Sequence, residues 1–297
     1  TLNIDSAVPS APTLTLATDS GPNGSDGITN VGTINVTDLE GGATWQYSTD
    51  SGANFSTGSG TSFVLAAGTY GAATVQVRQT DAAGNVSTVS SNVAAITVDT
   101  AAPAAPVFGP IATDNVINAS ELGVGFGGTS EPNAAIALTI GANTRLATAN
   151  GSGNWYYTWA QISGDITAMG QGSLSATATD AAGNVSAAGT RDITVDTVAP
   201  TLSGQATVNG NQLVLTYSEA LDGTNVPAPA AFAVSVNSAA NTVNTVAVSG
   251  STVTLTLATA VVNGDTVTVS YTDPTGGDDT LAIQDAAGND AGSLVSQ

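Results

Sequence analysis

The chain contains no cysteine, no histidine and no lysine, and its only basic residues are Arg78, Arg145 and Arg191. Without a thiol or an imidazole, neither a Ser-His-Asp nor a Cys-His nucleophile can be built, and zinc, haem and iron–sulfur sites lose their usual ligands. The chemistry that remains belongs to carboxylates. They could serve paired-acid glycoside hydrolysis, or they could bind hard cations through oxygen.

Positive charge is scarce as well, with 23 acidic residues against three basic ones and a net charge of -20. Nucleic acids and anionic membranes are both bound through clustered Lys and Arg, so the sequence excludes a nucleic-acid partner. No apolar run approaches the ~18 residues of a membrane helix, and no signal-peptide pattern opens the chain. We therefore expect no direct membrane insertion, and we interpret Thr1 as a cut inside a longer protein.

Two sequence marks repeat along the chain with a period of about 97 residues. Residues 80–87, Thr-Asp-Ala-Ala-Gly-Asn-Val-Ser, recur letter for letter at 179–186 and in shortened form at 284–289. The segment Ile-Thr-Val-Asp-Thr before an Ala-Pro pair occurs at 96–103 and 193–200, with a degenerate copy at 2–9. Internal repetition of this kind indicates a tandem array. It predicts three domains, at residues 1–99, 100–196 and 197–297.

Within each repeat, short runs alternate apolar residues with Thr or Ser, as in 213–217, 253–257 and 267–271. Such runs, broken by Asn-Gly, Asp-Gly and Gly-Ser turns, are typical of an antiparallel sandwich, and about 100 residues match a seven-stranded immunoglobulin-like fold. The predicted fold is all-β, with three tandem immunoglobulin-like β-sandwiches in an extended array. No helix longer than about two turns is expected.

The first two repeats resemble the bacterial Ig-like repeats of giant surface adhesins secreted by the type I route, the biofilm-associated and RTX-adhesin class. The resemblance lies in the Val-Asp-Thr-Ala-Ala-Pro junction, the Asp-Ala-Ala-Gly-Asn loop and residues 41–50. Residues 213–221 and 264–271 resemble a related repeat named for a cyanobacterial swimming-motility protein. The resemblance implies an extracellular stalk or extender region on a bacterial cell surface that binds Ca²⁺. The glycine-rich nonapeptide calcium repeats of such proteins are absent, which implies an internal segment.

Strand order in a seven-stranded sandwich places the incoming linker, the B–C loop and the F–G loop at one end. Each of these three elements carries an acid in every repeat. The linker acids are Asp5, Asp99 and Asp196, the B–C acids are Glu40, Glu131 and Glu219, and the F–G acids are Asp81, Asp180 and Asp285. Each repeat is therefore predicted to bring three carboxylates together beside its linker.

Three carboxylates at one place favour a bound cation. Two of them ~5 Å apart repel by roughly 3 kcal/mol at an effective dielectric of 20. Ca²⁺ takes six to eight oxygen ligands with little demand on geometry, whereas Mg²⁺ requires a tight octahedron. The alternative is that Asp-Ala-Ala-Gly-Asn is only a turn, in which Asp and Asn cap backbone amides and Gly takes a positive φ. Weaker metal candidates are Asp19, Asp26 and Asp114, and Asp273, Asp278 and Asp279 form an acidic loop with no predicted partner.

The aromatic residues admit a second function. Trp45 resembles the core Trp of strand C in Ig-like folds. In residues 155–159, either Tyr156 or the set of Trp155, Tyr157 and Trp159 must be exposed, because alternate residues of a strand face opposite sides. An exposed ring could stack on a sugar.

These observations lead to three functional hypotheses. The leading one is a calcium-stiffened spacer, not an enzyme, that projects a distal binding domain for cell adhesion or biofilm formation. Its partners are calcium ions and neighbouring repeats of the same chain, and the chain is expected to be a monomer. The alternatives are a module that binds a glycan or a cell-surface protein, and a glycoside hydrolase. The hydrolase is least favoured because the acids recur at the ends of repeats instead of forming one cleft.

Overall fold

The computed structural model describes residues 4–275 and 279–297. Strands make up 40% of the structure and helix 5%, so the chain is nearly all-β, as the period-two alternation predicts. The chain folds into two compact units. Unit 1 comprises Thr1–Gly109, Gly127–Tyr156 and Ser175–Thr190, and unit 2 comprises Pro110–Phe126, Tyr157–Leu174 and Arg191–Gln297.

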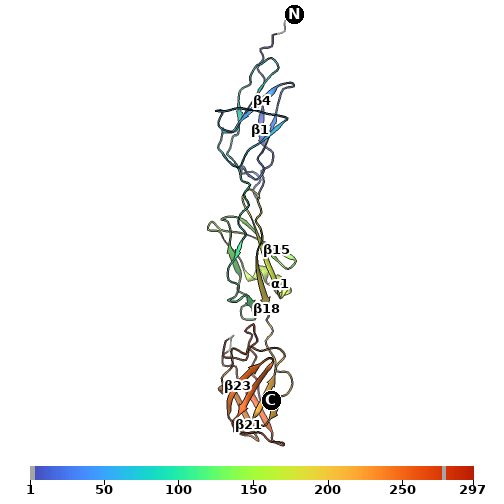
Figure 1. Ribbon diagram of the computed structural model, residues 1–297, viewed down its shortest axis with the longest axis vertical. Coiled ribbons are helices and arrows are strands. Elements are labelled where there is room, and N and C mark those ends of the chain that lie inside the picture. Colours follow the sequence, from blue (N-terminus) through green and yellow to red (C-terminus); the bar gives the residue numbers. More distant parts are fainter. Residues whose placement is uncertain (1–3, 276–278) are drawn as a thin grey trace. The chain divides into compact units, whose positions relative to one another are not determined.

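The first part of unit 1, which carries the labels β1 and β4 in Figure 1, contains three small sheets. One has the order β1 (Thr13–Leu16), β3 (Thr33–Thr37), β6 (Ser62–Val64). The second has the order β5 (Ser56–Thr57), β4 (Thr44–Ser48), β8 (Gln76–Thr80), β9 (Ser90–Ser91). The third has the order β2 (Ile28–Thr29), β10 (Ile96–Val98), β7 (Gly68–Tyr70), in which β2 and β10 are parallel.

The core of this part comes from alternate residues of β3, β4, β6, β8 and β10. Trp45 on β4 is 4% exposed and donates its indole N–H to the Gly60 carbonyl at 3.0 Å, which confirms it as a core residue. Gly58 lies against the ring, and a Cβ at that position would come within 2.2 Å of it. Only glycine leaves room here for the Trp45 ring.

Two sheets are built from residues 107–195. One has the order β11 (Val107–Phe108), β13 (Phe126–Thr129), β16 (Asn154–Tyr157). The other has five strands in the order β12 (Val116–Ile117), β18 (Gly189–Val195), β17 (Gly172–Thr179), β14 (Ala135–Ile140), β15 (Asn143–Thr148). In β14 every second residue is buried, since Ile136, Leu138 and Ile140 share one face.

The expectation that no helix exceeds two turns was wrong. Helix α1 (Trp159–Met169) has 11 residues, about three turns at 3.6 residues per turn. It begins after Thr158, whose backbone N–H donates to the side-chain carbonyl of Gln161 at 2.8 Å. Ile162 and Ile166, one turn apart, are fully buried. The sequence signal was weak because one short apolar stripe lies among Gly, Ser and Thr, which are poor helix formers.

The last part of unit 2 holds two antiparallel sheets. One has the order β19 (Thr207–Asn209), β20 (Gln212–Thr216), β24 (Thr252–Leu257), β23 (Val243–Ser249). The other has the order β22 (Ala239–Asn241), β21 (Phe232–Val236), β25 (Val267–Tyr271), preceded by the 3-10 turn Pro229–Ala231.

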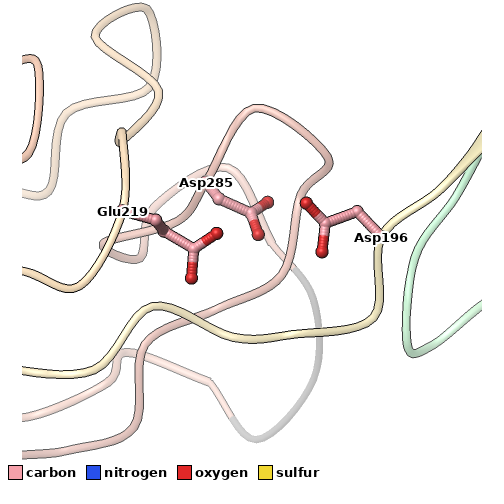
Figure 2. A group of neighbouring side chains, drawn as sticks. All are labelled: Asp196, Glu219 and Asp285. Atoms are coloured by element: carbon pink, nitrogen blue, oxygen red, sulfur yellow. The ribbon is translucent and has the colours of Figure 1, made fainter.

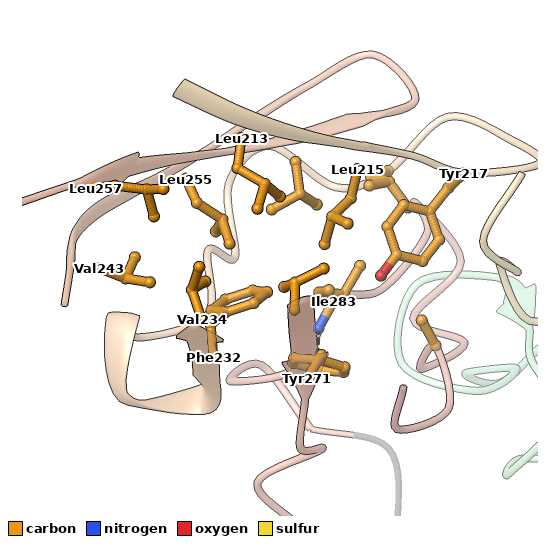
Figure 3. Close-up of a cluster of buried hydrophobic side chains, with 14 residues drawn as sticks. Leu213, Leu215, Tyr217, Phe232, Val234, Val243, Leu255, Leu257, Tyr271 and Ile283 are labelled. Carbon is orange, nitrogen blue, oxygen red and sulfur yellow. Dashed lines mark hydrogen bonds between the residues drawn. The ribbon is translucent and has the colours of Figure 1, made fainter. Parts of the chain in front are cut away.

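The core of this part comes from both sheets (Figure 3). Leu213 lies opposite Leu255 and Leu215 opposite Val253 in the β20–β24 ladder, so their side chains share the buried face. The chain after β25 is held to this core because the Ile283 amide donates to the Tyr271 hydroxyl at 2.9 Å. That contact fixes the path of the segment that carries Asp285.

Candidate metal centre

The Asp-Ala-Ala-Gly-Asn loop of unit 2 is a closed turn around the Asp285 carboxylate. Oδ1 accepts hydrogen bonds from the backbone amides of Ala287 at 2.8 Å and Asn289 at 2.9 Å, and Oδ2 accepts from Asn289 Nδ2 at 2.9 Å. Gly288 takes a φ of 87°, which only glycine adopts without strain. The capping bonds and the positive φ expected of a turn are therefore present, and they hold the carboxylate in one orientation.

The linker acid is tied to this loop through its backbone. Asp196 follows β18, and its carbonyl accepts from Asn289 Nδ2 at 2.9 Å. Its own amide donates to the Ile117 carbonyl at 3.0 Å, and its Oδ1 accepts from the Val198 amide at 3.1 Å. The Asn289 contact holds the Asp196 main chain beside the loop, and the Val198 amide orients the Asp196 carboxylate.

The B–C acid is brought to the same place by a short backbone pairing. Leu221 forms an antiparallel bridge with Asp285, and the Asp222 amide donates to the Gln284 carbonyl at 2.8 Å. Glu219 is two residues before Leu221, so it lies next to the loop that carries Asp285. Loops separated by more than sixty residues are thus joined by main-chain hydrogen bonds.

As a result, Asp196, Glu219 and Asp285 each offer a carboxylate oxygen within 4.8 Å of the others. Figure 2 shows the three carboxylates converging from three separate segments of chain. Asp285 is 3% exposed, and the other two are half-buried. Burial raises the pKa of Glu219, and the negative charges of Asp285 and Asp196 raise it further, against the opposing hydrogen bond of Ser218.

This arrangement suits a hard divalent cation. Three ionised carboxylates at this spacing repel one another by about 3 kcal/mol per pair at an effective dielectric of 20. A cation bound by carboxylate and carbonyl oxygens would offset that repulsion, and the variable geometry of six to eight oxygen ligands matches Ca²⁺.

Unit 1 contains the same loop twice. In both copies, the loop asparagine donates a hydrogen bond to the backbone carbonyl of the linker aspartate. Asn85 Nδ2 donates to the Asp5 carbonyl at 3.3 Å, and Asn184 Nδ2 donates to the Asp99 carbonyl at 2.9 Å. The F–G acids are held as Asp285 is, since Asn184 donates both its backbone amide and its Nδ2 to the carboxylate of Asp180, each at 2.8 Å. The contact between the linker and the F–G loop is therefore present in all three repeats, through the backbone carbonyl of the linker acid.

The B–C glutamates of unit 1 are placed differently. Glu40 and Glu131 are exposed, whereas Glu219 is half-buried. Among residues 4–275 and 279–297, Asp5, Glu40 and Asp81 do not gather within 4.8 Å of one another, nor do Asp99, Glu131 and Asp180. In unit 1, the Glu40 amide is held by the Gln79 side chain at 2.8 Å, which anchors the main chain and leaves the carboxylate in solvent.

The weaker metal candidates each cap backbone of their own loop. Asp19 Oδ2 accepts from the Gly27 amide at 2.9 Å, and Asp26 Oδ1 accepts from the Ile28 amide at 2.9 Å. Asp114 Oδ1 accepts from the Val116 amide at 2.8 Å. Within the described part of the chain, none of the three belongs to a group of three acids with oxygens this close.

Two residues of the acidic loop, Asp273 and Asp279, belong to a second group of three acids, whose third member, Asp290, the sequence did not predict. Asp273, Asp279 and Asp290 offer oxygens within 4.8 Å of one another, and the Asp279 amide donates to Asp290 Oδ2 at 3.1 Å. Asp278 lies outside the described residues. The signal that could have identified Asp290 is its position directly after the third Asp-Ala-Ala-Gly-Asn copy, which a search confined to one loop overlooks.

The aromatic segment resolves as one of its two alternatives. Trp155 is 3% exposed and Tyr157 is fully buried, whereas Tyr156 between them is 56% exposed. The exposed face of β16 therefore carries one tyrosine.

None of the described helices is both long and apolar enough to cross a membrane.

The chain is built from small, mostly antiparallel sheets, which is the architecture of an Ig-like β-sandwich. The comparisons with protein families agree with this fold class. Residues 109–197 match the family model of a bacterial Ig-like domain. Residues 195–276 match the SWM repeat, described as a "Putative flagellar system-associated repeat". These two matches confirm the resemblance of the second repeat to bacterial Ig-like repeats and of the third to the repeat named for a motility protein. No curated protein matches the chain.

Similar solved structures include three from bacterial adhesins. A structure described as a Ca²⁺-stabilised adhesin that helps an Antarctic bacterium bind ice is 20% identical, covering 91% of this chain and 72% of that one, with a TM-score of 0.37. A structure concerning host cell surface retention of a 1.5-MDa bacterial ice-binding adhesin is 15% identical, covering 90% and 94%, with a TM-score of 0.34. An immunoglobulin-like domain of the M. primoryensis ice-binding adhesin is 28% identical, covering 32% and 100%, with a TM-score of 0.26.

Proposed function

We propose that this chain is an extender segment of a large bacterial surface adhesin, stiffened by calcium bound between its repeats. It would hold a distal ligand-binding domain away from the cell. The observation that carries this proposal is the carboxylate cluster of Asp196, Glu219 and Asp285. The two family matches overlap at residues 195–197, so Asp196 lies where one kind of repeat gives way to the next.

The position of the cluster supports a mechanical role. Asp196 comes from the linker, whereas Glu219 and Asp285 come from loops of the following repeat. A cation that binds all three would restrain the linker against the repeat without being needed for the apolar core. The division into domains 1–99, 100–196 and 197–297 is part of this proposal, as are calcium at the linkers of Asp5 and Asp99 and a location outside the cell.

An expected affinity sets the size of the effect. A calcium site of extracellular grade has a dissociation constant of ~10⁻⁴–10⁻³ M. At roughly 10 mM calcium, each such site stabilises the bound form by about 1.4–2.7 kcal/mol. That is modest for a folded sandwich and large for a short linker. Bound metal would therefore reduce the flexibility of the linker more than it would change the folding of the sandwich.

The test compares the full chain with calcium and with chelator, by small-angle scattering and far-UV circular dichroism. We expect the maximum dimension or its spread to change while the strand signal persists. Isothermal titration of Asp196→Ala should show one fewer site than the parent chain. If chelator changed neither shape nor stability, the acids would be solvated turns and the spacer mechanism would be wrong.

The second candidate is a glycan-binding module, favoured by the exposed ring of Tyr156. Aromatic rings stack on sugars, yet single exposed aromatics are common without a ligand. A glycan array with the parent chain and Tyr156→Ser as matched control decides between them. Binding that depends on Tyr156 would support the module, and no binding would leave the spacer.

A further inference from the structure

The Asp-Ala-Ala-Gly-Asn loops make a second kind of contact, through atoms that play no part in the carboxylate cluster. In unit 1, Ser20 Oγ donates to the Ala182 carbonyl at 2.6 Å. The two backbones approach closely, since a Cβ on Gly21 would lie 2.1 Å from the Ala181 carbonyl oxygen. A Cβ on Gly183 would lie 2.9 Å from the Gly21 nitrogen. A pair of glycines thus allows one loop to lie directly on the other.

Unit 2 repeats this contact with different residues. Asn118 Nδ2 donates to the Ala287 carbonyl at 3.2 Å, and the Ala119 amide donates to Asn289 Oδ1 at 2.9 Å. Asn118 is only 8% exposed. Its Oδ1 accepts from the amides of Ser120 and Glu121 at 3.0 and 3.1 Å, which orients the side chain and leaves its amide for the Ala287 carbonyl.

The acceptor occupies the same position in both loops. Ala182 and Ala287 each stand two residues after the loop Asp, whereas the donors are a serine hydroxyl and an asparagine amide. Ser20 and Asn118 are not equivalent positions, but their segments correspond, since Asn30 follows β2 as Asn118 follows β12. A Cβ on Gly183 would lie 3.6 Å from the Asn30 side-chain nitrogen, and a Cβ on Gly288 would lie 3.2 Å from that of Asn118. Both donors lie in loops that precede the linker acid of the repeat they contact.

We infer that the Asp-Ala-Ala-Gly-Asn loop is a docking surface for a polar loop of the preceding repeat, and that this contact holds without metal. Its bonds join hydroxyl, amide and carbonyl groups, none of which needs a cation to offset charge. The alanine carbonyl thus restrains each junction separately from any restraint through the loop carboxylate. This inference uses the proposed division into repeats, but it does not depend on calcium.

The test uses the full chain and exploits its lack of cysteine. Two cysteines introduced at exposed sites and carrying nitroxide labels report one junction by electron–electron double resonance. Val93 and Leu146, 95% and 77% exposed, serve the contact in unit 1, and Val124 and Val262, 64% and 67% exposed, serve the contact in unit 2. The readout is the width of the distance distribution in chelator.

In chelator, Ser20→Ala should broaden the first distribution and leave the second unchanged, while Ser20→Thr, which keeps a hydroxyl, should match the parent. Asn118→Asp keeps the acceptor for Ser120 and Glu121 but loses the donor, and it should broaden only the second distribution. Loss of one net hydrogen bond of ordinary strength should lower the docked-to-undocked ratio about fivefold. Far-UV circular dichroism on each variant checks that the strands persist.

The outcomes separate this inference from the proposed function. If the distance distributions of the parent chain in chelator are already as broad as those of both variants, the inference is wrong, whatever the effect of calcium. If the variants broaden their own junctions while added calcium narrows neither, the docking contact stands and the calcium spacer fails. An effect of Ser20→Ala on the unit 2 pair would also overturn the inference, because that would indicate general loosening.

Discussion

The most informative single change is Glu219→Gln, because it removes charge from the cluster while keeping the size of the side chain. At full ionisation, two of the three carboxylate pairs involve Glu219, and each repels by about 3 kcal/mol at an effective dielectric of 20. The half-buried setting lets solvent screen much of this, so we expect a gain of ~1–2 kcal/mol in metal-free stability. The same variant should bind calcium about tenfold more weakly, for lack of one charged ligand.

The two effects have opposite signs, which makes the prediction sharp. At roughly 10 mM calcium, the stabilisation by metal should fall from about 1.4–2.7 kcal/mol in the parent to about 0.4–1.4 kcal/mol in Glu219→Gln. The variant should be more stable than the parent in chelator and should gain less from calcium. Hydrogen exchange of the strand amides in 212–216 and 252–257 reports this part of the chain separately from the rest.

The pH dependence follows from the raised pKa of Glu219 in the metal-free chain. The folded state holds the Glu219 proton more tightly than the unfolded chain does, so the penalty from this group is absent below the ordinary value of 4.5 and complete above the raised value. In chelator, the stability difference between parent and Glu219→Gln should shrink as the pH falls through that window.

Glu131→Gln is the matched control, because Glu131 is exposed and is not part of the cluster. It should leave the exchange of 212–216 unchanged in calcium and in chelator. The reasoning would be refuted if Glu219→Gln destabilised the chain in chelator and kept the full calcium response.

Three further predictions concern other positions. Asp99→Ala and Asp196→Ala should each remove a different calcium-binding event in isothermal titration, and a shared loss would show that the junctions are not separate. Asp81→Asn should lower stability at neutral pH, because the side-chain amide four residues later holds the pKa of Asp81 below its ordinary 3.8. That stabilisation is complete above 3.8 and is lost as the pH falls through the lowered value, so thermal melts of parent and variant should converge in strong acid. Gly58→Ala should cost about 1–3 kcal/mol by displacing the Trp45 ring, seen as a shifted fluorescence maximum and an earlier melt.

Local sequence pattern predicted the strands well. The alternation in 213–217 and 253–257 places Leu and Val on one face, and the structure buries that face. The Asp-Ala-Ala-Gly-Asn turn was equally predictable, because the Asp carboxylate reaches amides only two and four residues away. Helix α1 escaped prediction because its stability comes from the burial of Ile162 and Ile166, which a weak apolar stripe does not reveal.

The candidate site shows the same division. The order of loops correctly set linker Asp196 beside Asp285 and brought Glu219 to them. The same reasoning placed Glu131 with Asp180, but the structure leaves Glu131 exposed in its own turn. A B–C loop acid reaches the cluster only where the loop is paired to the F–G segment, as Leu221 is paired to Asp285.

The amino-acid sequence by itself determined which chemistry is available, the sandwich class, the repeat and the acids that could bind a cation, since each depends on composition or on residues close in the chain. Only the tertiary structure decided that Asp196, Glu219 and Asp285 meet within 4.8 Å and that Ser20 donates to the Ala182 carbonyl. Those facts depend on how far apart loops lie after distant strands have paired. Coulomb energy and hydrogen bonding change steeply over a few ångströms, and sequence spacing does not specify distances at that scale.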